Sequence, residues 1–102
     1  MFDQIIKLSR INPMPIFARS TKLTEEVGEF AEALLHHEGY LPHKVMKEGI
    51  EGEAADIIIC VIDVLVAAYP TLSDTEIVDL VNAQLHLKSE KWRTILGQHR
   101  QS

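Results

Sequence analysis

The sequence predicts an all-α fold, a bundle-like core of four helices within one domain covering residues 1–102. Apolar residues recur at three- and four-residue spacing in four segments, and prolines or glycines separate these segments. Repeats, low-complexity tracts and linkers are missing, and 102 residues suit a single core. A chain of this small size also makes oligomerisation plausible.

Two helices are predicted before the middle of the chain. The first covers residues 2–11 and ends at the prolines of residues 12–15, because proline disfavours helix in the residue before it. The second begins near Ser20 or Thr21, with Thr21 as a suitable N-cap, and Gly39 ends it. Its apolar stripe consists of Leu23, Val27, Phe30, Ala31 and Leu34.

The third helical pattern extends from His43 to Tyr69, and Pro42 suits its start. Gly49 and Gly52 weaken its first half, so a short helix followed by a break is an alternative. Its second half is apolar almost all round, which predicts the most buried helix of the fold. The β-branched run there could indicate a strand, but its length and its helix-spaced polar residues favour helix.

The last helix has the clearest local signal. Pro70 ends the preceding helix, and Ser73 with Glu76 forms a capping box. The helix is predicted to run to about Leu96, before a polar tail over residues 98–102 that frays. Its predicted buried residues are Ile77, Leu80, Val81, Leu85 and Trp92.

Composition limits the partners. The net charge of −5 and the pI near 5.4 argue against a nucleic-acid backbone as the main partner. Cys60 is the one cysteine, so an intrachain disulfide is impossible and a cytoplasmic setting fits. The N-terminus lacks the pattern of a signal peptide. The longest apolar run, residues 57–68, contains Asp63 and is too short to span a bilayer.

Carboxylates at helical spacing stand out within segments predicted to be core. Glu26 and Glu29 share one helix face, and Glu53 and Asp56 share another. Antiparallel packing of the two helices would bring all four together. Glu25, beside the first pair, could orient or deprotonate a water molecule.

Converging carboxylates repel one another unless a cation lies among them, and oxygen-only ligands suit Mg²⁺ or Mn²⁺. Asp63 would lie behind such a cluster as a further acceptor. The alternative is that these pairs lie on solvated helix faces, as E-x-x-E pairs usually do. Di-iron chemistry needs Glu-x-x-His pairs, which the cluster lacks.

Residues 22–32, KLTEEVGEFAE, together with Glu53-Ala54-Ala55-Asp56-Ile57, resemble the two-part signature of MazG-like, all-α nucleoside triphosphate pyrophosphatases. The resemblance implies a four-helix core that assembles as a homodimer or homotetramer. It also implies Mg²⁺-dependent hydrolysis of nucleoside triphosphates to a monophosphate and pyrophosphate. The implied metal ligands are Glu26, Glu29, Glu53 and Asp56, with Glu25 beside them.

The family also places basic residues on the last helix, where Lys88 and Lys91 are the candidates for holding phosphates. Trp92 could stack on a base or belong to the core. Asn82 could contact base or sugar, or be an exposed helix residue. Lys22 could reach a phosphate or pair with Glu26. Lys44 and Lys47 could be surface charges or part of a phosphate-facing lid.

The main hypothesis is therefore a nucleotide pyrophosphohydrolase. A non-catalytic helical module that binds nucleotides or a partner is the alternative, motivated by the imperfect match of the basic residues. A third possibility is an enzyme acting on another phosphoanhydride, such as a phosphoribosyl-ATP-like metabolite.

Overall fold

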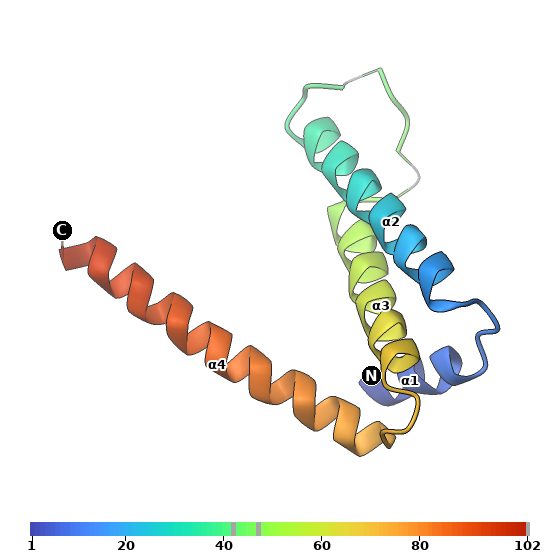
Figure 1. Cartoon of the computed structure of the whole chain (residues 1–102). Helices are drawn as coiled ribbons and strands as arrows, with labels where there is room; N and C mark the ends of the chain where they lie inside the picture. Colours follow the sequence, from blue (N-terminus) through green and yellow to red (C-terminus); the bar gives the residue numbers. More distant parts are fainter. Residues whose placement is uncertain (42, 47, 102) are drawn as a thin grey trace. The chain divides into compact units, whose positions relative to one another are not determined.

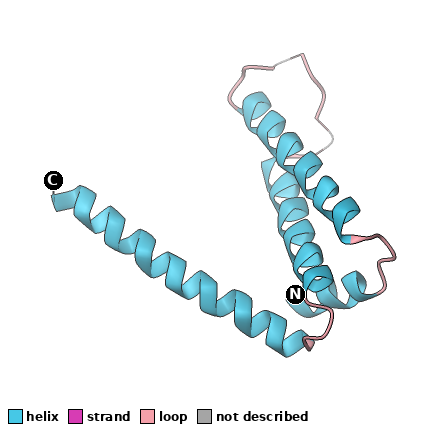
Figure 2. Cartoon of the chain, in the orientation of Figure 1, coloured by secondary structure: helices cyan, strands magenta, loops and turns pink. Residues whose placement is uncertain are grey.

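A computed structural model describes residues 1–41, 43–46 and 48–101, and these form four helices and no strand (Figures 1 and 2). The all-α prediction is confirmed. The helices are α1 (Phe2–Arg10), α2 (Ile16–His37), α3 (Ile50–Ala68) and α4 (Asp74–Gln101). Within the described residues, none of them combines the length and apolarity that crossing a membrane requires.

The chain divides into two compact units, Met1–Pro70 and Thr71–Ser102. In the first unit, α2 and α3 run antiparallel, side by side, and α1 packs against α3 (Figure 1). The most buried apolar side chains of this unit come from all three helices: Ile6, Ala33, Ile62 and Val66. The expectation of one domain over residues 1–102 stays a prediction.

Helix α2 begins earlier than the sequence suggested. Its N-cap is Pro15, in an extended conformation, and the helix starts at Ile16 rather than near Ser20. Proline is tolerated at the start of a helix, because the first N–H groups of a helix have no intrahelical partner and the missing N–H of proline therefore costs no hydrogen bond. Thr21 therefore lies inside the helix, where its Oγ1 donates to the Phe17 carbonyl at 2.9 Å. The predicted end is confirmed, since Gly39 has a φ of 87°.

Helix α3 begins later than predicted. Residues 43–46 and 48–49 are turns, bends or irregular backbone, and Gly49 is the N-cap of a helix that starts at Ile50. The low helix propensity of glycine outweighs the apolar periodicity before this point. The predicted start at Pro42 lies outside the described residues, as does Lys47.

The burial predicted all round α3 is only partly observed. Ile58 and Ile59 are about half exposed, and Val61 is also exposed, because the neighbours of α3 within its unit are α1 and α2. One side of α3 therefore forms core, whereas another stays open within the unit Met1–Pro70.

Helix α4 forms the second unit, and its capping box is confirmed. The Ser73 N–H donates to Glu76 Oε1 at 3.0 Å, and the Glu76 N–H donates to Ser73 Oγ at 3.1 Å. The helix continues past the predicted end near Leu96 as far as Gln101, so the tail predicted to fray is helical to that residue. A single glycine, Gly97, costs only about 1 kcal/mol in a helix and does not end it.

Of the α4 side chains predicted to be buried, Ile77 is buried, as predicted, at 3% exposure, whereas three others are exposed. Leu80 and Leu85 are about half exposed, and Trp92 is 65% exposed. The prediction of their burial within the chain is wrong, because helical periodicity shows that a face is apolar but not what covers it.

Candidate metal centre

Three carboxylates converge between α2 and α3. Glu26 comes from α2, and Glu53 and Asp56 come from the first two turns of α3. One oxygen of each lies within 4.8 Å of one oxygen of the other two. The antiparallel arrangement of the two helices brings these three positions together, without Glu29, the fourth carboxylate of the predicted cluster.

Two of these carboxylates are buried and incompletely paired. Glu26 is 4% exposed and Glu53 is 6% exposed. Among the described residues, Glu26 Oε2 and Glu53 Oε2 have no hydrogen-bond partner. Buried polar atoms in proteins nearly always have a partner, and an ionised oxygen without one is costly. The cluster therefore has the capacity to bind a cation or to retain a proton.

Lys22 supplies positive charge at the edge of this cluster. Its Nζ lies 3.0 Å from Glu26 Oε1, in an i,i+4 pair along α2. The hydrogen bond to Glu26 and the charge of Glu26 raise the pKa of Lys22. One ammonium group cannot neutralise three carboxylates, and Oε2 of Glu26 stays without a partner.

The pKa of Glu53 reflects the excess of negative charge around it. Burial raises this pKa, because it disfavours the ionised form, and the negative charge of Glu29 raises it further. The charges of Glu48, Asp56 and Glu26 act in the same direction. Without a cation, the surroundings therefore disfavour the ionised form of Glu53.

Glu48 is a further carboxylate beside this group that the sequence did not reveal. It lies in the loop before α3, and the charge of Asp56, burial and a side-chain hydrogen bond with Asp56 raise its pKa. Glu48 Oε2 would lie 2.8 Å from a Cβ added at Gly52, so the missing side chain of that glycine leaves room for it. Gly52 within the helical pattern was the available signal.

Two predicted site residues of α2 lie at the periphery. Glu29 is exposed and does not belong to the three carboxylates whose oxygens converge, although its charge acts on Glu53. Glu25 is exposed and lines a surface hollow of about 400 Å³ to which Lys22 also contributes. The structure thus brings together Glu26, Glu53 and Asp56, with Lys22 paired to the first.

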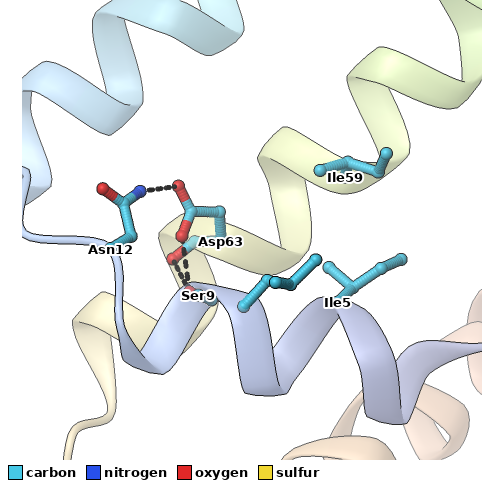
Figure 3. A pocket seen from close by; sticks show the side chains of 6 residues that line it. Ile5, Ser9, Asn12, Ile59 and Asp63 are labelled. Carbon is cyan, nitrogen blue, oxygen red and sulfur yellow. Dashed lines mark hydrogen bonds between the residues drawn. The ribbon is translucent and has the colours of Figure 1, made fainter.

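Asp63 has partners of its own and is not an acceptor behind the cluster. Its Oδ1 accepts from Ser9 Oγ at 2.5 Å and from Arg19 Nη1 at 2.8 Å. Its Oδ2 accepts from Asn12 Nδ2 at 2.9 Å, and Figure 3 shows Ser9 and Asn12 on either side of the carboxylate. Arg19 also donates to the carbonyls of Asn12 and Met14, both at 2.7 Å. These bonds connect α1, the segment after it, α2 and α3.

A hollow of about 280 Å³ lies beside this network. Ile5 and Ile59 form apolar parts of its wall, and Asp63 lies at its polar end (Figure 3). Since both oxygens of Asp63 already accept hydrogen bonds, this hollow offers no unpaired carboxylate to a ligand.

The remaining predicted substrate residues lie on α4. Asn82, Lys88, Lys91 and Trp92 are all exposed, in the unit Thr71–Ser102, whereas the carboxylates belong to Met1–Pro70. Their roles stay predictions.

Comparisons with protein-family models, with curated proteins and with solved structures found no match. The chemistry of the cluster therefore carries the functional argument. Its donors are carboxylate oxygens, which Mg²⁺ and Mn²⁺ prefer, and neither sulfur nor imidazole belongs to the group. The two unpaired, buried oxygens are suited to such an ion.

Proposed function

We propose that this protein is a Mg²⁺-dependent nucleoside triphosphate pyrophosphohydrolase of the MazG-like kind. It would convert standard or modified nucleoside triphosphates, deoxynucleotides included, to a monophosphate and pyrophosphate. The observation that carries the proposal is the convergence of Glu26, Glu53 and Asp56, two of them buried with an unpaired oxygen. The resemblance of residues 22–32 and 53–57 to the family signature supports this reaction over others.

In this proposal Glu26, Glu53 and Asp56 hold the ion, and Glu29 completes the ligand set that the signature implies. Mg²⁺, or Mn²⁺ in its place, supplies charge neutralisation for the phosphates and acidifies water. The residues fit such an ion because the group has oxygen donors, a surplus of negative charge and unpaired buried atoms. Glu48 adds a further carboxylate beside Asp56.

Glu25 is the proposed base. Its exposed carboxylate, next in sequence to Glu26, accepts a proton from the attacking water. The water oxygen bonds to the α-phosphorus, the bond from that phosphorus to the bridging oxygen breaks, and pyrophosphate leaves. Lys88 and Lys91 are proposed to stabilise charge on the pyrophosphate, and Asn82 and Trp92 to contact the nucleoside.

We also propose that the chain assembles as a homodimer or homotetramer with a four-helix core, in the cytoplasm. Large apolar side chains exposed on α2 and α3, and separately on α4, support assembly, because exposed apolar surface commonly marks an interface. They include Val27, Leu34, Ile58 and Ile59 in the first unit and Leu80, Leu85, Leu87, Trp92, Ile95 and Leu96 on α4.

Pyrophosphate release from a panel of nucleotides with Mg²⁺ tests the proposed reaction, and the panel includes modified nucleotides and a phosphoribosyl-ATP-like anhydride. Glu53→Gln and Asp56→Asn should lower turnover at least about a hundredfold, since each removes a charged ligand of the ion. The matched control is Glu32→Gln, which removes an exposed carboxylate paired with Lys44. Wild-type protein that is inactive on the whole panel would contradict the proposal.

A helical module that binds nucleotides or a partner without catalysis is the second candidate. The exposed apolar side chains of α4, with Trp92 among them, favour it. Calorimetry with α,β-methylene-ATP, beside the turnover assay, separates the two. Binding without turnover of any panel member supports the module, whereas turnover supports the enzyme.

A further inference from the structure

Lys22 is the cation that the described ion pairs place on the carboxylate cluster. Its Nζ lies 3.0 Å from Glu26 Oε1, whereas the other cations in those pairs meet Asp63, Glu32 and Glu90. The two ends of this pair differ sharply in burial. The Lys22 side chain is 59% exposed, and that of Glu26 is 6% exposed. The carboxylate is therefore fixed in the protein, whereas the ammonium group is free to leave towards solvent.

The relative size of two effects decides what happens when a divalent cation arrives. An i,i+4 pair with an exposed lysine contributes little stability, so it is easily broken. An ammonium group and a divalent cation on one carboxylate repel each other, and low solvent exposure strengthens the repulsion. The repulsion between the two cations is larger than the stability of the ion pair between Lys22 and Glu26. A cation bound through Glu26 and Glu53 therefore expels Lys22 more readily than it shares Glu26 with it.

Resting on the proposed function, we infer that Lys22 is a tethered counterion: a divalent cation displaces it from Glu26, and it then binds a phosphate group of the metal-bound ligand. The one residue thus has two successive partners. It offsets part of the negative charge while the cation is absent, and it adds positive charge for the phosphates once the cation is bound.

The surroundings of Lys22 allow this exchange. Lys22 lines the hollow of about 400 Å³ at the surface, together with Glu25 and Thr21. Arg19, on the same hollow, is already held by Asp63 and by backbone carbonyls, so its charge is committed. The Lys22 ammonium is thus the cationic group on this side that can change partner.

We expect Lys22→Met to change the affinities for two ligands in opposite directions. In a calorimetric titration with Mn²⁺ alone, Lys22→Met should bind the ion about two- to fivefold more tightly than wild type, because the ion no longer displaces an ammonium group. With saturating Mg²⁺, the same variant should bind α,β-methylene-ATP about tenfold more weakly, because it has lost a charged phosphate contact. Lys22→Arg should keep both affinities near those of wild type.

Lys7→Met is the matched control, since Lys7 is exposed on α1, has no role in the proposed site, and the variant has the same change in net charge. It should leave both affinities unchanged. Equal or weaker Mn²⁺ binding in Lys22→Met would overturn the inference, and weaker binding would show instead that Lys22 orients Glu26. An absence of Mn²⁺ binding in wild type as well would contradict the proposed function itself, so the two failures are distinguishable.

Discussion

Asp56 and Asp63 lie two turns apart on α3, yet their surroundings are opposite in kind. Asp63 accepts hydrogen bonds from Ser9, Asn12 and Arg19, so its charge is matched. Asp56 meets other carboxylates instead, and two of its neighbours in the cluster have unpaired, buried oxygens. The same residue type, on the same helix, thus belongs to a completed network in one place and to an incomplete one in the other.

The difference separates a carboxylate that stabilises the fold from carboxylates that are available to a ligand. A buried acid whose acceptor sites are filled stabilises the native state, and its removal leaves donors unpaired. Buried acids with unfilled sites destabilise the native state until a proton or a cation arrives. The following experiments test whether the two groups of residues behave in these opposite ways.

The largest expected effect is the loss of the Asp63 network. Arg19→Ala should lower the free energy of unfolding by about 3 kcal/mol, because it leaves a largely buried carboxylate without its cation. Urea denaturation measures this change. Arg93→Ala, which breaks an exposed pair with Glu90, should cost no more than about 0.5 kcal/mol. Equal effects of the two variants would remove the distinction between the network and a surface pair.

A divalent cation should stabilise the protein through the other group. At a hundred times its dissociation constant, Mn²⁺ should raise the free energy of unfolding by about 2.7 kcal/mol, provided that it binds only the folded state. Glu53→Gln should lose this gain, since it removes a buried charged ligand. Thermal unfolding with and without Mn²⁺ provides the measurement. A gain that persists in Glu53→Gln would place the ion elsewhere.

The pH dependence should have opposite signs in two parts of the chain. The folded-state pKa of Glu53 and that of Glu48 are raised, so their ionisation opposes folding. This loss is absent below pH 4.5 and complete above the raised pKa values. Hydrogen bonds with Ser73 lower the pKa of Glu76, so its contribution is present above pH 4.5 and is lost below the folded-state pKa.

Glu53→Gln should therefore make the metal-free protein more stable near pH 8, by an amount that declines towards pH 4.5. Melting temperatures measured in the presence of a chelator between these pH values test this expectation. If the melting temperatures of the variant and of wild type depend on pH in the same way, ionisation of Glu53 does not destabilise the folded protein.

The smallest effect concerns Gly52. In Gly52→Ala the new Cβ would displace the Glu48 side chain, which should weaken Mn²⁺ binding a few-fold and change stability by less than about 1 kcal/mol. Gly28→Ala is the control, because nothing lies within 4 Å of a Cβ there. It should gain up to about 1 kcal/mol from helix propensity and bind Mn²⁺ as wild type does. Unchanged Mn²⁺ binding in Gly52→Ala would exclude Glu48 from the site.

Local signals in the sequence predicted much of the fold. The capping box of Ser73 and Glu76 formed as expected, because its two hydrogen bonds join residues three apart. Gly39 ended α2 for an equally local reason, its positive φ. The start of α2 was misplaced because a threonine suited to an N-cap can also lie inside a helix, as Thr21 does.

Contacts between distant residues could not be predicted in the same way. The partners of Asp63 lie 44 to 54 residues earlier in the chain, so helical spacing from Asp56 gave it the wrong role. Glu48 escaped notice because the predicted helix over residues 43–69 included it, whereas it lies in the loop before α3. The grouping of Glu26 with Glu53 and Asp56 could be predicted because all three lie on consecutive helices, and consecutive elements usually pack side by side.

The central claim is that the unpaired carboxylates between α2 and α3 hold a divalent cation. Calorimetric titration of metal-free protein with Mn²⁺ tests it most directly, with Glu53→Gln and Glu32→Gln beside wild type. We expect saturable binding by wild type and by Glu32→Gln, and a loss of at least tenfold in affinity for Glu53→Gln. Equal affinity in all three proteins, or no binding by wild type, would contradict it.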